Sequence, residues 1–141
     1  MDEMSKSERS AAGTRPMSPA LRWAGYLVSG LPVLMLLLSA TMKFLQPAGM
    51  QEQLGKLGWS SDKMLALGVV ELLSTVLYVI PQTSVLGAIL LTGYLGGATA
   101  THVRVGDAFA IPVLLGVLLW VGLLLREPRL AALVPLRRHA S

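Results

Sequence analysis

Four apolar stretches separated by short polar connections make up most of the chain. They cover residues 23–45, 63–80, 85–103 and 108–125. A membrane-spanning α-helix needs about 20 predominantly apolar residues, and the stretches have about that length. The pattern therefore predicts an all-α chain: an integral membrane four-helix bundle that crosses the lipid bilayer several times. We expect the first span to stay uncleaved, because no convincing small-residue cleavage site follows it.

The longest connection, residues 46–63, has its own apolar side. Leu54, Leu57 and Trp59 supply it between polar neighbours. Such spacing is typical of a short amphipathic helix in the membrane interface. We therefore expect a helix near residues 49–57.

Basic residues are concentrated toward the chain ends. Those at the ends are Lys6, Arg9, Arg15, Arg22, Arg126, Arg129, Arg137 and Arg138, and those between the spans are Lys43, Lys56, Lys63 and Arg104. The positive-inside rule then predicts that both termini are cytoplasmic, which requires an even number of spans. We divide the chain into a disordered tail (1–20), a transmembrane domain (21–125) and a basic tail (126–141). This topology brings Lys43, residues 46–63 and residues 102–107 to the outer face.

Composition narrows the functional classes. Apolar residues make up 53% of the chain and charged residues 14%, so a soluble catalytic domain is not expected. The absence of cysteine excludes disulfides, thiol redox relays and iron–sulfur ligation. The net charge of +4 does not predict nucleic-acid binding, because the basic residues do not follow one helix face.

Glu71 is the first candidate for chemistry, since it lies inside the second span. A carboxylate in hydrocarbon costs roughly 3 kcal/mol and needs a partner, a proton or a role. Ser74, Thr75 and Tyr78 follow at spacings that share one helix face. Glu71 is therefore either a proton acceptor or polar contact for a quinone head group, or a structural anchor. As an anchor it would pair with Lys43 or His102.

The outer end of the third span holds three more candidates. The His102 imidazole is suited to proton exchange near neutral pH. Neither metal nor haem binding is predicted, because His139, the other histidine, lies in the tail across the membrane. Arg104 and Asp107 are three residues apart in a tight turn, so we expect them to form a stabilising ion pair.

Small residues at Gly93 and Gly97 predict close helix packing within the bundle. A homodimer face or space for a flat ligand ring remains the alternative there. Tyr94 and Trp120 are interpreted as packing or lipid-facing aromatics. The chain has no phosphate-binding glycine loop, nucleophile elbow or zinc motif.

Several segments together resemble the DoxX-like family of small bacterial membrane proteins. They are SATMKFLQP, LGW, GVVELLSTVLYVIP and LGAILLTGYLGGATATHVRVGD. The resemblance covers most of residues 30–115 and is most specific at Lys43, Glu71 and residues 87–107. Two features depart from the family pattern: the polar pair at 74–75 and the absence of proline from the turn after Trp59.

The resemblance implies a four-helix bundle in the bacterial inner (cytoplasmic) membrane. For some branches it also implies quinone-linked sulfur oxidation or oxidative-stress complexes. Lys43, Glu71, His102 and Arg104 would then bind a lipid quinone or an anionic substrate, and Glu71 and His102 would pass protons as the catalytic pair. Tyr78, on the Glu71 face, and Asp107, in the outer turn, complete the candidate substrate-binding set.

The chain supplies no redox centre of its own. Its electrons would come from a bound quinone or from a soluble or membrane redox partner, which makes it a subunit rather than a complete enzyme. Whether it catalyses a reaction itself stays open. The alternatives are a membrane scaffold without catalysis, and a small lipophile-converting enzyme or transporter.

Overall fold

The computed structural model describes residues 18–133, and the regular structure within them is α-helical. The helices are α2 (Pro19–Leu45), α3 (Met50–Leu57), α4 (Ser61–Val79), α5 (Ser84–Val105), α6 (Ala110–Arg126) and α7 (Pro128–Leu133). The all-α prediction is confirmed, and α3 lies where a short amphipathic helix was predicted. The predictions for residues 1–17 and 134–141 fall outside the described residues.

Helix α2 begins ahead of its predicted start at residue 23. Ser18 is its N-cap, with a hydroxyl that accepts the amide of Leu21 at 3.4 Å, and Pro19 fills the first helical position. Both residue types favour a helix start. The helix continues through the buried Pro32 to Leu45, and its C-cap Gln46 has a left-handed conformation with φ of 40°.

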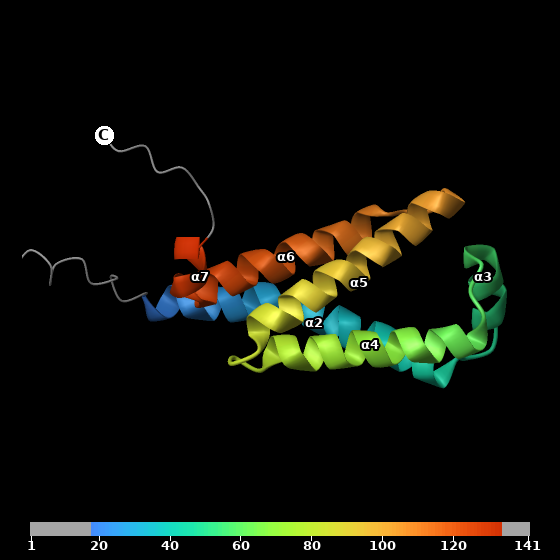
Figure 1. The fold of residues 1–141 in the computed structure, drawn as a ribbon, viewed down its shortest axis with the longest axis horizontal. Coiled ribbons are helices and arrows are strands. Elements are labelled where there is room, and N and C mark those ends of the chain that lie inside the picture. Colours follow the sequence, from blue (N-terminus) through green and yellow to red (C-terminus); the bar gives the residue numbers. More distant parts are fainter. Residues whose placement is uncertain (1–17, 134–141) are drawn as a thin grey trace, which may run out of the picture.

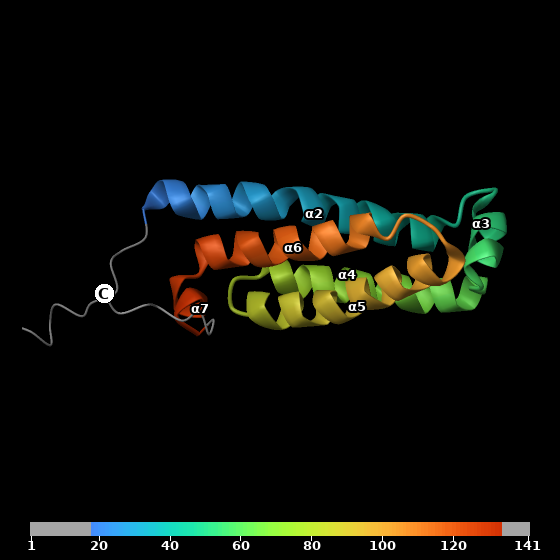
Figure 2. The same cartoon turned by 90° about the horizontal axis from the view of Figure 1, so that it is seen from above.

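The four long helices lie side by side in a closed ring of contacts (Figures 1 and 2). Helix α2 contacts α4 and α6, and α5 also contacts α4 and α6. In Figure 1 the pair α2 and α4 diverges from the pair α5 and α6 toward the end where α3 crosses the molecule. We call this the open end, and the end with the α4–α5 turn and α7 the closed end.

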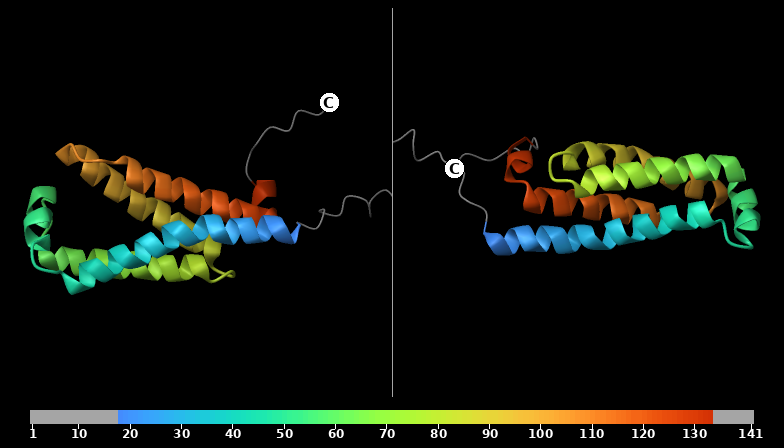
Figure 3. Two further views of the ribbon diagram at one scale, coloured as in Figure 1. Left: turned by 180° about the vertical axis from the view of Figure 1, so that it is seen from behind. Right: turned by 90° about the horizontal axis from the view of Figure 1, so that it is seen from below.

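The closed end is held by unusually close backbone contacts. A Cβ atom added at Gly25 on α2 would lie 2.8 Å from the carbonyl oxygen of Gly122 on α6. One added at Gly87 on α5 would overlap the backbone of Tyr78 on α4. Only glycine permits such approaches, so these positions fix how the helix pairs meet. The left panel of Figure 3 shows the two pairs converging at this end, seen from behind.

The buried core runs between the helices toward the open end. It consists of Leu36, Tyr78, Ala88, Leu91, Leu95, Leu115, Leu119 and Leu123. All four long helices contribute to it, as expected if each buries one face against its neighbours.

The outward faces of the same helices are also strongly apolar. Leu27 on α2 is 76% exposed, and Leu73, Ile89 and Leu114 on α4, α5 and α6 are each more than half exposed. Apolar surface of this extent is typical of contact with a membrane or a protein. Within the described residues, α2 and α5 are long and apolar enough to cross a bilayer.

Candidate functional site

The divergence of the helix pairs leaves a cavity of about 770 Å³ at the open end. Residues from α2 to α6 line it, and most of the lining is apolar. It includes every methionine within residues 18–133, namely Met35, Met42, Met50 and Met64. Methionine is flexible and polarisable, so such a lining adapts to the shape of an apolar guest.

An ion pair between α2 and α4 forms one wall of the cavity. Lys43 Nζ lies 2.9 Å from Glu71 Oε2, and the side chains of Lys43 and Glu71 are 16% and 1% exposed. Of the two partners expected for Glu71, the structure selects Lys43. A buried carboxylate of this kind is tolerated only when paired.

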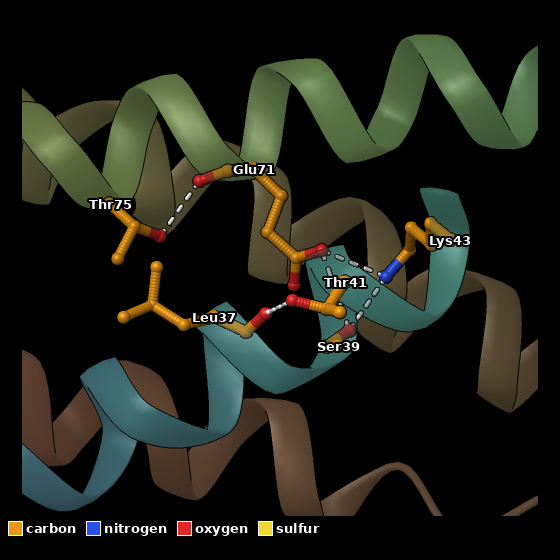
Figure 4. A network of polar contacts seen from close by, with 6 residues as sticks. All are labelled: Leu37, Ser39, Thr41, Lys43, Glu71 and Thr75. Carbon is orange, nitrogen blue, oxygen red and sulfur yellow. Dashed lines mark hydrogen bonds and ion pairs between the residues drawn. The ribbon is translucent and has the colours of Figure 1, made fainter. Parts of the chain in front are cut away.

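Ser39 joins the pair into a three-membered network (Figure 4). Lys43 Nζ donates to Ser39 Oγ at 2.6 Å, and Ser39 Oγ donates to Glu71 Oε2 at 3.4 Å. Ser39 lies one helical turn before Lys43, so α2 presents both to Glu71. The Thr75 hydroxyl bonds the Glu71 carbonyl oxygen at 2.7 Å and therefore makes no bond to the carboxylate.

Tyr94 and His102 line the same cavity from α5. The ammonium of Lys43 lies 5.8 Å from the centre of the Tyr94 ring, within the range of a cation–π contact. The His102 side chain is 31% exposed and thus lies at the solvent side of the cavity. Together with Lys43 and Glu71 these residues offer an aromatic face and four titratable groups around one apolar space.

The expected ion pair of Arg104 and Asp107 is wrong. Asp107 Oδ2 instead lies 3.1 Å from His102 Nδ1, while its Oδ1 accepts the amide of Ala108 at 2.7 Å. The backbone bond from Ala108 and then the bond to His102 lower the pKa of Asp107. Asp107 therefore orients the imidazole of His102 rather than a guanidinium.

Arg104 instead contacts a residue that is far from it in the sequence, so spacing along the chain did not predict this partner. Its Nη2 donates to the carbonyl oxygen of Leu57 at 2.6 Å, at the C-terminus of α3. A cation there satisfies a free helix carbonyl and complements the helix dipole. Arg104 thus fastens α3 to α5, and neither Arg104 nor Asp107 lines the cavity.

Tyr78 lies away from the cavity, although it shares a helix face with Glu71. Its hydroxyl donates to the carbonyl oxygen of Leu119 at 2.7 Å and lies 2.9 Å from the Ser29 hydroxyl. Seven residues advance a helix by about 10 Å, which carries Tyr78 to the closed half. Of the six predicted site residues, the cavity lining contains Lys43, Glu71 and His102.

The helix-packing interpretation of Gly93 and Gly97 is also wrong for the described chain. A Cβ added at either would meet nothing within 4 Å, and both glycines line the cavity. They provide space rather than close contact, which agrees with the alternative of room for a flat ring.

Sequence reasoning missed Ser39, Tyr94 and the methionines as parts of the site. The sequence did contain an indication that Ser39 belongs to the site, because it precedes Lys43 by four residues and so shares its helix face. The indication for Tyr94 was weaker: it falls between the two glycines that line the cavity. Within residues 18–133, no three His, Cys, Asp or Glu side chains gather as a metal site would require.

Comparison with known proteins and families identifies a family for the chain. No curated protein and no solved structure matches the chain. A family model described as the DoxX-like family matches residues 27–122, which include all four long helices in large part and every polar residue of the cavity. The chain therefore belongs to the DoxX-like family.

Proposed function

We propose that this membrane protein binds a lipid quinone in the open-end cavity and serves as a subunit of a quinone-linked oxidoreductase or oxidative-stress complex. One observation carries the proposal. The buried Lys43–Glu71 pair forms a wall of a methionine-lined cavity that His102 also borders.

The lining suits a ring that carries polar oxygens. Ligand sites are typically apolar with a few convergent polar groups. A lysine ammonium has three N–H donors, and the structure engages two of those of Lys43, with Ser39 and Glu71. The remaining donor is available to a carbonyl oxygen of the ring, while Gly93 and Gly97 leave room beside it.

A bound quinone would supply two-electron, two-proton redox chemistry, and the chain's own residues would manage the protons. Lys43 would hold the ring oxygen, while Glu71 balances the charge of the ammonium. His102, partly exposed and bonded to Asp107, connects the cavity with the aqueous phase. Electrons would pass between the quinone and a redox partner.

The protein is proposed to cross the inner membrane four times, with both termini in the cytoplasm. Support comes from the outward apolar side chains on all four long helices and from the basic residues at the chain ends. Of the four long helices α4 is the least apolar, and its buried carboxylate at Glu71 is neutralised by Lys43. The open end would then face outward.

Quinone binding is tested by filling the cavity without touching a charge. Gly97→Leu places a side chain in the cavity lining, whereas Gly96→Leu adds the same side chain at a glycine outside that lining. Both replacements favour helix. Native mass spectrometry with lipid extraction should find a retained quinone in wild type and Gly96→Leu, and much less in Gly97→Leu.

Glu71→Gln should also lower quinone retention, and Tyr78→Phe is its control at the closed half. If no quinone is retained by wild type, or if Gly97→Leu retains as much as Gly96→Leu, the quinone proposal fails. The scaffold function would then be favoured.

Topology is tested separately, because the chain lacks cysteine and gives a clean background for labelling. Gln53→Cys lies on α3, and Gln82→Cys lies in the exposed α4–α5 turn. An impermeant maleimide should label Gln53→Cys on intact cells and Gln82→Cys after permeabilisation. Labelling of Gln82→Cys on intact cells would contradict the proposed orientation.

A further inference from the structure

A second cavity, of about 490 Å³, lies at the closed end. Its lining residues are Arg22, Tyr26, Pro81, Ser84, Leu123, Arg126, Glu127, Pro128 and Arg129. Three arginines and one carboxylate leave the lining positively charged. This cavity, the closed-end pocket, is separate from the Lys43–Glu71 site and plays no part in the proposed quinone binding.

One of the three guanidinium groups is held in place by the fold. Arg126 Nη2 donates to the carbonyl oxygen of Tyr78 at 3.2 Å. The Arg126 guanidinium lies 4.6 Å and 5.4 Å from the ring centres of Tyr78 and Tyr26. A guanidinium carries five N–H donors in a planar fork, so an oriented group with several remaining donors borders the pocket.

The side chains of the other two arginines make no polar contact within the described part of the chain. The side chains of Arg22 and Arg129 are exposed, and neither forms a hydrogen bond or ion pair with another residue of the described part of the chain. Helix α5 also begins at Ser84 in the lining, which turns the positive end of its dipole toward the pocket. These charges converge on one space that holds a single carboxylate, that of Glu127.

On the topology proposed above, aromatic residues would put the pocket at head-group depth. Trp23 is 69% exposed and packs edge-on against Tyr26, with ring centres 6.2 Å apart. Exposed Trp and Tyr side chains are characteristic of the membrane–water interface. Next to them, Leu27 and Leu31 offer an exposed apolar surface along which acyl chains could lie.

We propose that the closed-end pocket binds a phosphate group of net negative charge, one without the compensating cation of a zwitterionic head group. Planar guanidinium groups pair with phosphate oxygens through two parallel hydrogen bonds, which favours arginine at such sites. The depth of the pocket and the neighbouring apolar surface fit the phosphodiester of an anionic phospholipid, and a basic pocket between helices is a typical site for such head groups.

The test uses the full-length protein in neutral detergent, with short-chain phosphatidylglycerol and phosphatidylcholine as competing probes in native mass spectrometry. Wild type should retain one phosphatidylglycerol in preference to phosphatidylcholine. The variant Arg22→Gln/Arg129→Gln should lose affinity for phosphatidylglycerol by about tenfold or more. Both positions are exposed, so folding should be preserved.

The matched control is Lys56→Gln/Lys63→Gln, which removes the same charge at the open end. It should keep the preference for phosphatidylglycerol. Glu127→Gln should strengthen binding, because it removes the one carboxylate of the lining. Equal binding of the two lipids by wild type, or an equal loss in both double variants, would overturn the proposal.

A second arm distinguishes the source of the phosphate. Inorganic phosphate at millimolar concentration should leave the lipid bound if the pocket recognises a phospholipid. If phosphate displaces it, and the displacement needs Arg22 and Arg129, the pocket binds the free anion instead.

Discussion

At the closed end the backbones of α2 and α6 approach so closely that a Cβ on Gly25 would lie 2.8 Å from the Gly122 carbonyl oxygen. At the open end Gly93 and Gly97 face empty space, with nothing within 4 Å of an added Cβ. The same residue type therefore closes the helix ring at one end and leaves room for a ligand at the other.

The buried polar groups also differ between the two ends: those of the closed end are enclosed in the core, and those of the open end border a cavity. At the closed half the Tyr78 hydroxyl is engaged by Ser29 and by the Leu119 carbonyl oxygen, within the core. At the open end Lys43 and Glu71 satisfy each other but still border a cavity. A rigid anchor at one end lets the helices separate at the other without loss of the fold.

The largest effect should come from breaking the open-end ion pair. Lys43→Met leaves the buried Glu71 carboxylate unpaired, which should cost about 3 kcal/mol of unfolding free energy. Adding Glu71→Gln should recover most of this loss, because no unpaired charge remains. Thermal unfolding in detergent measures both, and a double variant as unstable as Lys43→Met alone would contradict the role of the pair.

The next effect should come from the tight contact at the closed end. Gly87→Ala forces a methyl group into the backbone of Tyr78 and should destabilise by about 2 kcal/mol. Gly97→Ala, at the open end, should stabilise slightly, by up to about 1 kcal/mol, since alanine favours helix. Melting temperatures of the two variants compare the ends directly. Equal losses would show that the open end is as tightly packed as the closed end.

A smaller effect is expected where α3 is fastened over the open end. Arg104→Gln removes the charged hydrogen bond to the Leu57 carbonyl oxygen, worth about 1 kcal/mol. Amide hydrogen exchange should accelerate in α3 and stay unchanged in α6. Lys56→Gln removes a charge from α3 without touching this bond and should leave exchange nearly unaltered. Unchanged α3 exchange in Arg104→Gln would mean that other contacts hold the helix.

The smallest effect should be the pH dependence contributed by Asp107. Its pKa is lowered in the folded protein by the Ala108 amide and by His102. The carboxylate therefore adds stability above its ordinary pKa of 3.8, and this stability is lost as the pH falls through the lower folded value. The difference in melting temperature between wild type and Asp107→Asn should be small at neutral pH and vanish in acid. A difference that grows on acidification would have the wrong sign.

The helices could be predicted closely because their signals are local. Helix α4 was expected over 63–80 and covers Ser61–Val79, and α5 was expected over 85–103 and covers Ser84–Val105. The apolar run of α4 ends just before Pro81. The apolar run of α5 ends just before Gly106, whose φ of 73° does not fit a right-handed helix. Such stops require no knowledge of distant residues.

The site was predictable only in part, because its geometry depends on how helices incline toward one another. Charge and depth narrowed the partner of Glu71 to Lys43 or His102, and the structure was needed to identify Lys43. The partner of Arg104, by contrast, is a carbonyl on α3, which lies 47 residues earlier in the chain. Whether Gly97 meets a helix or a cavity depends on the same inclination, so spacing along the sequence could not distinguish the two.

The methionine lining gives the cavity a chemical sensitivity of its own. Oxidants convert a thioether to a sulfoxide, which is polar, and reductases reverse the change. Since Met35, Met42, Met50 and Met64 all border the cavity, oxidation would turn its apolar wall polar and expel an apolar guest. The fraction of cavities that hold an apolar guest would then fall as these methionines are oxidised and rise again as they are reduced.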